Sequence, residues 1–107
     1  MNDGPAVTIS TTIEMELTSL LHALGDPVRL EIVRELDRDG TRACGSFGHL
    51  GVSPSTLSHH FRVLRDAGLV ETSHAGTRRL NSLRREAVDD SFPGLLDAVL
   101  ASAPSLR

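Results

Sequence analysis

The sequence predicts a mainly α-helical fold with one small β-hairpin, and three patterns support this prediction. Apolar residues recur at helical spacing over most of the chain. Glycine or proline stands beside most of the expected helix ends. After Gly68 the pattern becomes extended, with two short runs around a glycine loop. A chain of 107 residues has room for one domain. We expect this domain at residues 11–101, with a flexible N-terminal tail at 1–10 and a C-terminal tail at 102–107.

The first two helices have clear ends in the sequence. Leucines recur at helical spacing over residues 11–24, and Gly25 closes this segment. Asp26 and Pro27 begin the second helix, because aspartate caps the free amides of the first turn and proline is accepted there. The second helix ends at Asp39–Gly40.

The middle of the chain carries charged pairs and a weaker helical segment. Glu31 with Arg34 and Glu35 with Arg38 have the spacing of ion pairs on one helix, and we expect them on the surface. Residues 41–52 contain three glycines, which lower the helix propensity. We still expect a short helix there, because a helix-turn-helix needs a supporting element before its second helix.

Residues 53–67 form the clearest expected helix. Ser53 can cap its first turn, and Pro54 loses no hydrogen bond in the first helical position. Its apolar face consists of Leu57, Phe61, Leu64 and Ala67. The opposite face carries Ser55, Ser58, His59, Arg62 and Asp66. The candidates for contacts with bases are Ser55, Thr56, Ser58 and His59, and Arg62 is a candidate for contact with phosphate. Short hydroxyls followed by histidine and arginine suit a helix that reads bases in a major groove and binds phosphate. An ordinary solvated helix face is the alternative.

A hairpin follows this helix directly. Residues 69–74 and 78–83 are expected strands on either side of a glycine loop. The tip carries His74, Arg78 and Arg79, which are candidates for contacts with phosphate or the minor groove; a loop that is only soluble is the alternative. The order of short helix, turn, second helix and hairpin predicts a winged helix-turn-helix.

The formal net charge of −3 hides an uneven distribution. Residues 53–85 carry six arginines against Asp66 and Glu71, which gives +4, so the rest of the chain sums to −7. Binding to phosphate depends on the local potential rather than on the overall charge. All eleven basic residues are arginine, which favours paired hydrogen bonds to phosphate and guanine, although a bias in genome composition explains this usage equally well.

A terminal helix is expected to begin at Ser91–Gly94 and to carry an apolar stripe. So small a domain leaves little apolar surface inside the chain against which this stripe could pack. Together with the leucines of the first helix it is the candidate dimer interface, with internal packing as the alternative. The interface residues would be Leu17, Leu20, Leu21, Leu24, Leu95, Leu96, Val99 and Leu100.

The sequence gives little support for a membrane protein, a secreted protein or an enzyme. The sequence has no apolar run long enough to span a bilayer and no signal-peptide pattern, so we expect a cytoplasmic protein. Cys44 is the only cysteine, which excludes an internal disulfide and favours a small buried apolar role. No nucleophile elbow, zinc-protease motif or phosphate loop is present, so an enzyme is not predicted.

Two segments together resemble a known family. The junction Leu24-Gly25-Asp26-Pro27-Val28-Arg29-Leu30-Glu31-Ile32 is followed by the serine-rich stretch from Ser53 to Val70. In this order they resemble the ArsR/SmtB family of bacterial winged-helix repressors, over residues 15–100. The resemblance implies a homodimer with its first and last helices at the interface. It also implies repression from an inverted repeat until an effector releases the protein.

The usual effector of that family is a metal ion, and here the sequence departs from the family pattern. The two cysteines of the arsenic- and cadmium-sensing members fall on Arg42 and Cys44, so one thiolate is missing. The zinc-sensing members use aspartate and histidine on the last helix, but residues 86–101 contain no histidine. Neither metal site is carried over.

The five histidines offer one other route to a metal effector. A nickel or zinc site between subunits is possible, but no spacing rule selects its ligands. His59 and His60 are adjacent and point about 100° apart, which is poor geometry for one ion. We expect His60 to be a hydrogen-bonded packing residue.

The sequence therefore predicts a dimeric repressor that binds double-stranded DNA. A winged-helix module that binds a protein partner is the alternative. DNA binding would weaken steeply with salt, whereas an apolar protein contact would tolerate salt.

Overall fold

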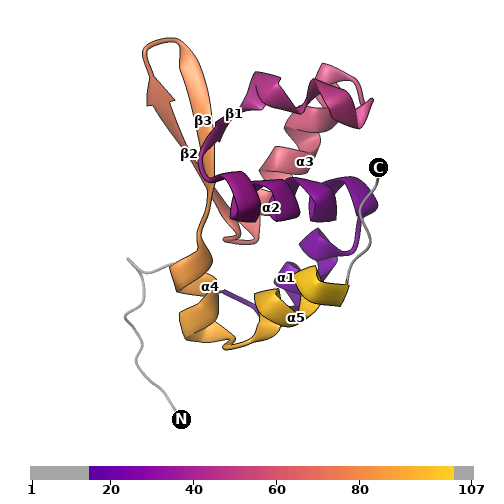
Figure 1. Ribbon diagram of the computed structural model, residues 1–107, viewed down its shortest axis with the longest axis vertical. Helices are drawn as coiled ribbons and strands as arrows, with labels where there is room; N and C mark the ends of the chain where they lie inside the picture. The colour runs from indigo at the N-terminus through magenta and orange to yellow at the C-terminus, as the bar shows by residue number, and fades with distance from the viewer. Residues whose placement is uncertain (1–14, 103–107) are drawn as a thin grey trace.

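The computed structural model describes residues 15–102, which form five α-helices, one 3-10 segment and a three-stranded sheet (Figure 1). In chain order the elements are α1 (Leu17–Leu24), α2 (Pro27–Asp39), β1 (Arg42–Ala43), η2 (Cys44–Leu50), α3 (Pro54–Asp66), β2 (Val70–Ala75), β3 (Arg78–Leu83), α4 (Arg85–Ser91) and α5 (Leu95–Ser102). This arrangement confirms the predicted mainly helical fold with a small β-hairpin. Within residues 15–102, no helix has the length and apolar character that a membrane crossing needs.

The start of α2 confirms the expected cap. Asp26 Oδ2 accepts hydrogen bonds from the backbone nitrogens of Val28 (2.9 Å) and Arg29 (3.1 Å). Pro27 occupies the first helical position, where its missing N–H costs nothing. The preceding helix differs from the prediction, because α1 begins at Leu17 rather than at residue 11; residues 11–14 lie outside the described part.

Two elements differ from the sequence-based expectation. Residues 41–52 do not form one short α-helix: Arg42 and Ala43 pair with Asn81 and Leu80 of β3, and a 3-10 segment follows. The terminal helical region is also divided, because α4 precedes α5 and was not predicted. Both differences arise from partners that are distant along the chain.

The hairpin confirms the prediction of two strands. In the antiparallel sheet β3 lies between β1 and β2, and the register of the hairpin runs from Val70 opposite Leu83 to Ala75 opposite Arg78. A two-residue turn joins the strands, and its first residue, Gly76, has a φ of +65°. Glycine adopts this left-handed conformation without steric cost.

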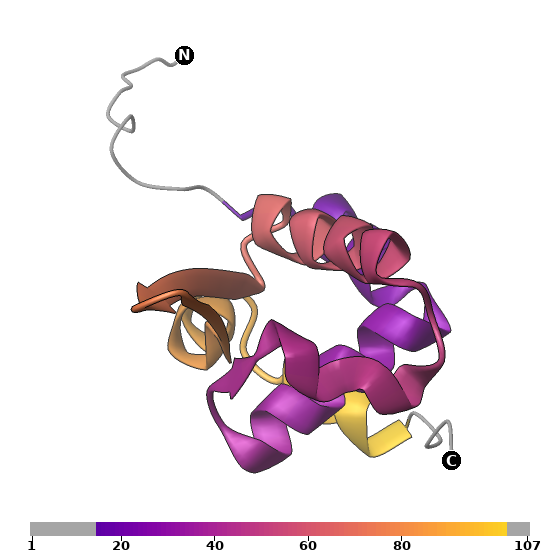
Figure 2. The same cartoon turned by 90° about the horizontal axis from the view of Figure 1, so that it is seen from above.

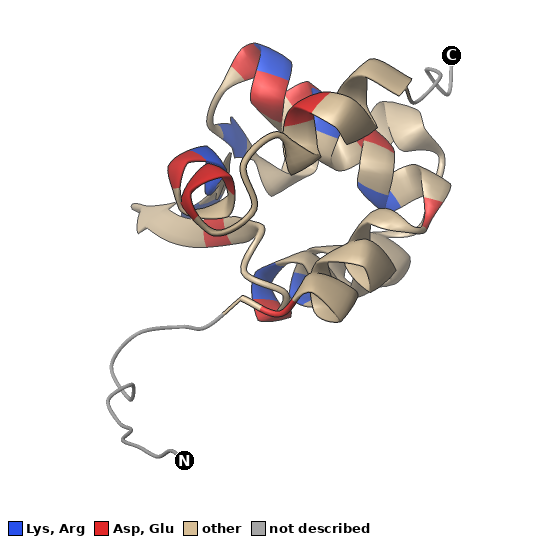
Figure 3. Cartoon of the chain, turned by 90° about the horizontal axis from the view of Figure 1, so that it is seen from below, with Lys and Arg blue, Asp and Glu red and all other residues tan. Residues whose placement is uncertain are grey.

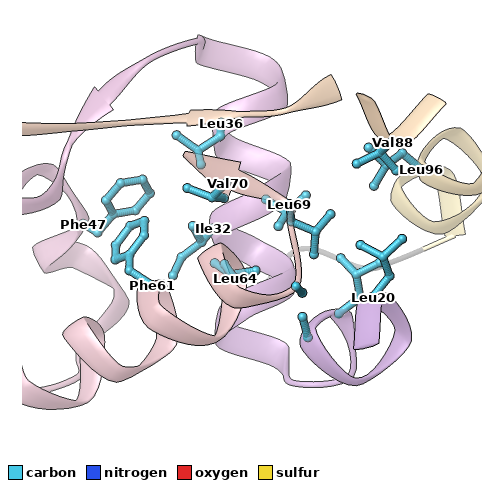
Figure 4. Close-up of a cluster of buried hydrophobic side chains, with 14 residues drawn as sticks. Leu20, Ile32, Leu36, Phe47, Phe61, Leu64, Leu69, Val70, Val88 and Leu96 are labelled. Atoms are coloured by element: carbon cyan, nitrogen blue, oxygen red, sulfur yellow. The ribbon is translucent and has the colours of Figure 1, made fainter. Parts of the chain in front are cut away.

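The core is built by helices and hairpin together. Phe47 of η2 and Phe61 of α3 meet edge to face with centroids 5.4 Å apart at one end of the cluster. Figure 4 shows Leu20, Val88 and Leu96 at the other end of the same cluster. The core therefore joins α1, α4 and α5 to the helix-turn-helix.

This packing corrects part of the predicted dimer interface. Leu20 and Leu96 are completely buried within one chain and Leu24 is 7% exposed, so these three side chains are not available to a partner. By contrast, Leu17 and Leu21 are 44% and 47% exposed. The other three predicted interface residues, Leu95, Val99 and Leu100, are half-buried against the core.

The glutamates of α2 are buried, so the expected ion pairs do not lie on the surface. Glu31 pairs with Arg34 as expected, with 3.4 Å between Oε1 and Nε, whereas Arg38 pairs with Asp39 instead of Glu35. Glu31 and Glu35 are 2% and 1% exposed. Glu35 accepts hydrogen bonds from Arg42 Nη1 (2.6 Å) and His49 Nε2 (2.8 Å), so its partners come from β1 and η2 rather than from Arg38. Burial alone would raise the pKa of Glu35, but interactions with other side chains, led by the hydrogen bond from His49 and including the one from Arg42, lower the pKa from 4.5 to about 2.

We expect Glu35 to make the fold sensitive to acid. Because its pKa is lower in the folded chain, its contribution to stability is present above pH 4.5 and is lost as the pH falls from 4.5 towards about 2. Glu35→Gln should lower the free energy of unfolding at neutral pH by about 1–3 kcal/mol, because Arg42 and His49 lose an ionic partner. Urea unfolding at neutral and acid pH measures both effects. The exposed Glu86→Gln is the matched control, and an equal loss in that variant would contradict the expectation.

Candidate nucleic-acid interface

The turn between η2 and α3 produces a helix-turn-helix. Gly51 ends η2 with a φ of +76°, a conformation that favours glycine. Ser53 then caps α3, since its Oγ accepts from the backbone nitrogen of Thr56 at 3.2 Å. The predicted cap and the predicted start of the helix at Pro54 are both confirmed.

One face of α3 is buried and the other is open. His60, Phe61 and Leu64 face the core, and Leu57 is half-buried. All five residues predicted to contact DNA from this helix are exposed: Ser55, Thr56, Ser58, His59 and Arg62. Thr56 Oγ1 accepts a hydrogen bond from Ser53 Oγ at 2.9 Å. This outer face has the small donors and the guanidinium that a major groove accommodates.

The hairpin tip is exposed beside this helix. His74, Arg78 and Arg79 are all exposed, and His74 lies opposite Arg79 in the register. Adjacent residues of a strand point to opposite faces, so the two arginines leave the hairpin on different sides. The tip and the first turn of α3 lie at the same end of the molecule (Figure 1), and the hairpin extends to one side of the helices (Figure 2).

Four arginines of the basic segment are available to a ligand. Within the described residues 15–102, the guanidinium groups of these four make no hydrogen bond or ion pair: Arg62, Arg65, Arg78 and Arg79. Arg65 is half-buried on α3 and was not among the predicted contact residues.

The other two arginines of residues 53–85 already have partners within the chain. Arg84 donates to the backbone oxygen of Gly68 (3.1 Å), and Arg85 is bound by Asp37, Asp89 and Asp97. Most acidic residues of the described part are on α2 and α4, away from the outer face of α3 (Figure 3). The charge difference seen in the sequence is thus also a separation in space.

The residues at the family's cysteine positions do not fit a thiolate metal site. Arg42 lies over the ring of Phe47, with its guanidinium carbon 4.3 Å from the centroid, and also binds Glu35. Cys44 is half-buried, and its sulfur accepts a hydrogen bond from Asn81 Nδ2 at 3.1 Å. Over residues 15–102, no three histidine, cysteine, aspartate or glutamate side chains are close enough together to hold a metal ion.

Several known proteins are similar to this chain in sequence and in fold. A family model for bacterial regulatory proteins of the arsR family matches residues 26–72. The arsenical resistance operon repressor of Staphylococcus xylosus is 39% identical over 74 residues, which cover 69% of this chain and 71% of that protein. The regulator NmtR of Mycobacterium tuberculosis is 32% identical over 103 residues, or 96% of this chain and 82% of that protein.

A solved structure agrees with these sequence matches. The cadmium metal-sensor CmtR of Mycobacterium tuberculosis has a TM-score of 0.58 and 31% identity, and the match covers 86% of this chain and 98% of that one. The matched residues 26–72 include the whole helix-turn-helix and the start of the hairpin. The chain therefore belongs to the ArsR family of DNA-binding transcriptional regulators.

Proposed function

We propose that this regulator is a cytoplasmic dimeric repressor that binds an inverted repeat in double-stranded DNA. The observation that supports this most directly is the outer face of α3, where hydroxyl, imidazole and guanidinium groups are all exposed. A relative named as an operon repressor supports the direction of regulation.

The proposed contacts divide into base and phosphate contacts. Ser55, Thr56, Ser58 and His59 would contact base edges, because short polar side chains near the start of a helix can enter a major groove. Arg62 would bind the phosphate backbone beside them. In the hairpin, His74, Arg78 and Arg79 would contact phosphate or the adjacent minor groove.

The proposed dimer interface is smaller than the sequence suggested. Leu17 and Leu21 are the exposed large hydrophobic side chains of the described residues, and both are on α1. The half-buried side chains Leu95, Val99 and Leu100 of α5 would extend this surface. Two copies related by a two-fold axis would place their α3 helices one turn of DNA apart, about 34 Å.

A metal effector is not supported by the described residues of one chain. His49 and His60 have partners in Glu35 and Arg29. A nickel or zinc effector would need ligands from two chains or from residues outside 15–102. The proposal of DNA binding does not depend on such a site.

Selection from a pool of randomised DNA duplexes tests the proposed function. We expect the enriched sequences to contain an inverted repeat with half-site centres about one helical turn apart. The logarithm of the affinity for the selected duplex should fall linearly with the logarithm of the salt concentration. Failure to enrich any sequence, together with salt-tolerant capture of a protein, would favour the alternative of a protein-binding module.

A further inference from the structure

Arg29 links the end of α1 to the inner side of α3. Its guanidinium is almost completely buried, with the whole residue 8% exposed. Nε donates to the backbone oxygen of Ala23 (2.8 Å), and Nη2 donates to that of His22 (3.2 Å). Nη1 donates to Nδ1 of His60 at 3.2 Å. One side chain thus holds two carbonyls of α1 and the imidazole of α3.

This geometry requires His60 to be neutral at Nδ1. Arginine has no acceptor, so Nδ1 must offer its lone pair to Arg29. His60 is itself 8% exposed, and its Nε2 is 3.9 Å from Asp26 Oδ2, which is too far for a hydrogen bond. The ring of His59 is 6.0 Å away. Burial lowers the pKa of His60, Asp26 opposes this effect, and Arg29 and His59 lower the pKa further.

We propose that the contact between Arg29 and His60 positions the recognition helix α3 for DNA, and that DNA binding requires the neutral form of His60. This inference rests on the proposed function. His60 is directly followed by the core residue Phe61 and directly preceded by the exposed His59. Loss of the contact with Arg29 would therefore remove a restraint from the turn of α3 that carries the outer face.

Protonation of His60 would oppose this contact. A proton on Nδ1 would face a donor of Arg29 at 3.2 Å, and two cations would share a buried site. Asp26, which caps α2, is the acidic group that faces the ring and would attract it after protonation. The ring would then turn from Arg29 towards Asp26, and α3 would lose its connection to the end of α1.

Three variants separate this positioning role from other effects. His60→Asn keeps an acceptor at the δ position and does not titrate. His60→Leu keeps the burial but leaves Arg29 Nη1 without an acceptor. His22→Gln is the matched control, because it removes another exposed histidine, one that lies on α1 and outside the proposed DNA contacts. Fluorescence anisotropy with the selected duplex at constant salt measures the affinity of each full-length variant, and circular dichroism measures its thermal unfolding.

The expected pH dependence of DNA affinity differs between the variants. Between about pH 7.5 and pH 5 the wild type should lose affinity about threefold to tenfold, since protons bind the free protein in preference to the complex. His60→Asn should keep the neutral-pH affinity within about threefold and should also keep it on acidification, because asparagine does not titrate. His22→Gln should lose affinity on acidification as the wild type does. His60→Leu should bind about tenfold more weakly at neutral pH.

Each other outcome overturns a defined part of the argument. A wild type that binds no duplex overturns the proposed function and this inference with it. If the wild type binds but gains affinity in acid, or if His60→Asn shows the same acid loss as the wild type, the inference alone is wrong. His60→Leu with unchanged affinity also overturns it. The affinity of each variant could also fall only in proportion to its unfolded fraction. In that case the contact between Arg29 and His60 would have a structural role alone, and the inference would be wrong.

Discussion

Replacing Arg62, Arg78 and Arg79 together by alanine should weaken binding to the selected duplex on the order of 100-fold at about 0.15 M salt. All three side chains are exposed, and none has an ionic partner within the described residues. They are therefore free to replace counterions on phosphate. Each lost phosphate contact should also reduce the slope of the logarithm of affinity against the logarithm of salt by about 1.

The matched control for this effect is Arg38→Ala. Arg38 is also exposed, but it binds Asp39 through Nε at 2.8 Å and lies on the acidic helix α2. The Arg38→Ala variant loses the same charge as the single variant Arg62→Ala. If only the net charge mattered, the two variants would therefore show the same change in DNA affinity and in salt slope. We expect the control to leave the salt slope unchanged. An equal change of slope in the two single variants would contradict the proposed surface.

Substitution of two neighbouring leucines of α1 should change the free energy of unfolding by very different amounts. Leu20 is completely buried, and Leu20→Ala should lower the free energy of unfolding by about 2–5 kcal/mol through lost contacts and a cavity. Leu21 is 47% exposed, so Leu21→Ala should change the unfolding of the monomer by less than about 0.5 kcal/mol. Urea unfolding of both variants at low protein concentration measures this difference.

The two exposed leucines of α1, Leu17 and Leu21, test the proposed dimer interface. The double variant Leu17→Asp and Leu21→Asp should remain folded but sediment as a monomer, because it places charge on the proposed interface. It should also bind the duplex more weakly, since one recognition helix replaces two. A double variant that stays dimeric would place the interface elsewhere and would leave α1 as a simple exposed helix.

The sequence predicted the elements whose signals are local. Ser53 with Pro54 marks the start of α3, and Gly76 marks the turn of the hairpin, so each element could be placed from neighbouring residues. β1 depends on pairing with β3, nearly forty residues later. Such a short strand has no pattern of its own, and the helix expected at residues 41–52 was inferred from the need of a helix-turn-helix for a supporting element rather than from the local sequence.

Two further differences also have a tertiary cause. Residue Arg84 precedes α4 without a side-chain cap, and the helix is held instead by ion pairs of Arg85 to α2 and α5. Periodicity identified the apolar face of α1 correctly. It could not show that Leu20 is covered by the chain itself while its neighbour Leu21 stays exposed.

The register of the hairpin limits which changes of length the protein can accept. Asn81 of β3 is completely buried, where it accepts a hydrogen bond from Thr72 (2.7 Å) and donates one to Cys44. Inserting a single residue into β3 would turn every later side chain to the other face of the sheet and would expel this amide from the interior. Insertions and deletions of odd length in the strands of the hairpin should therefore be strongly disfavoured.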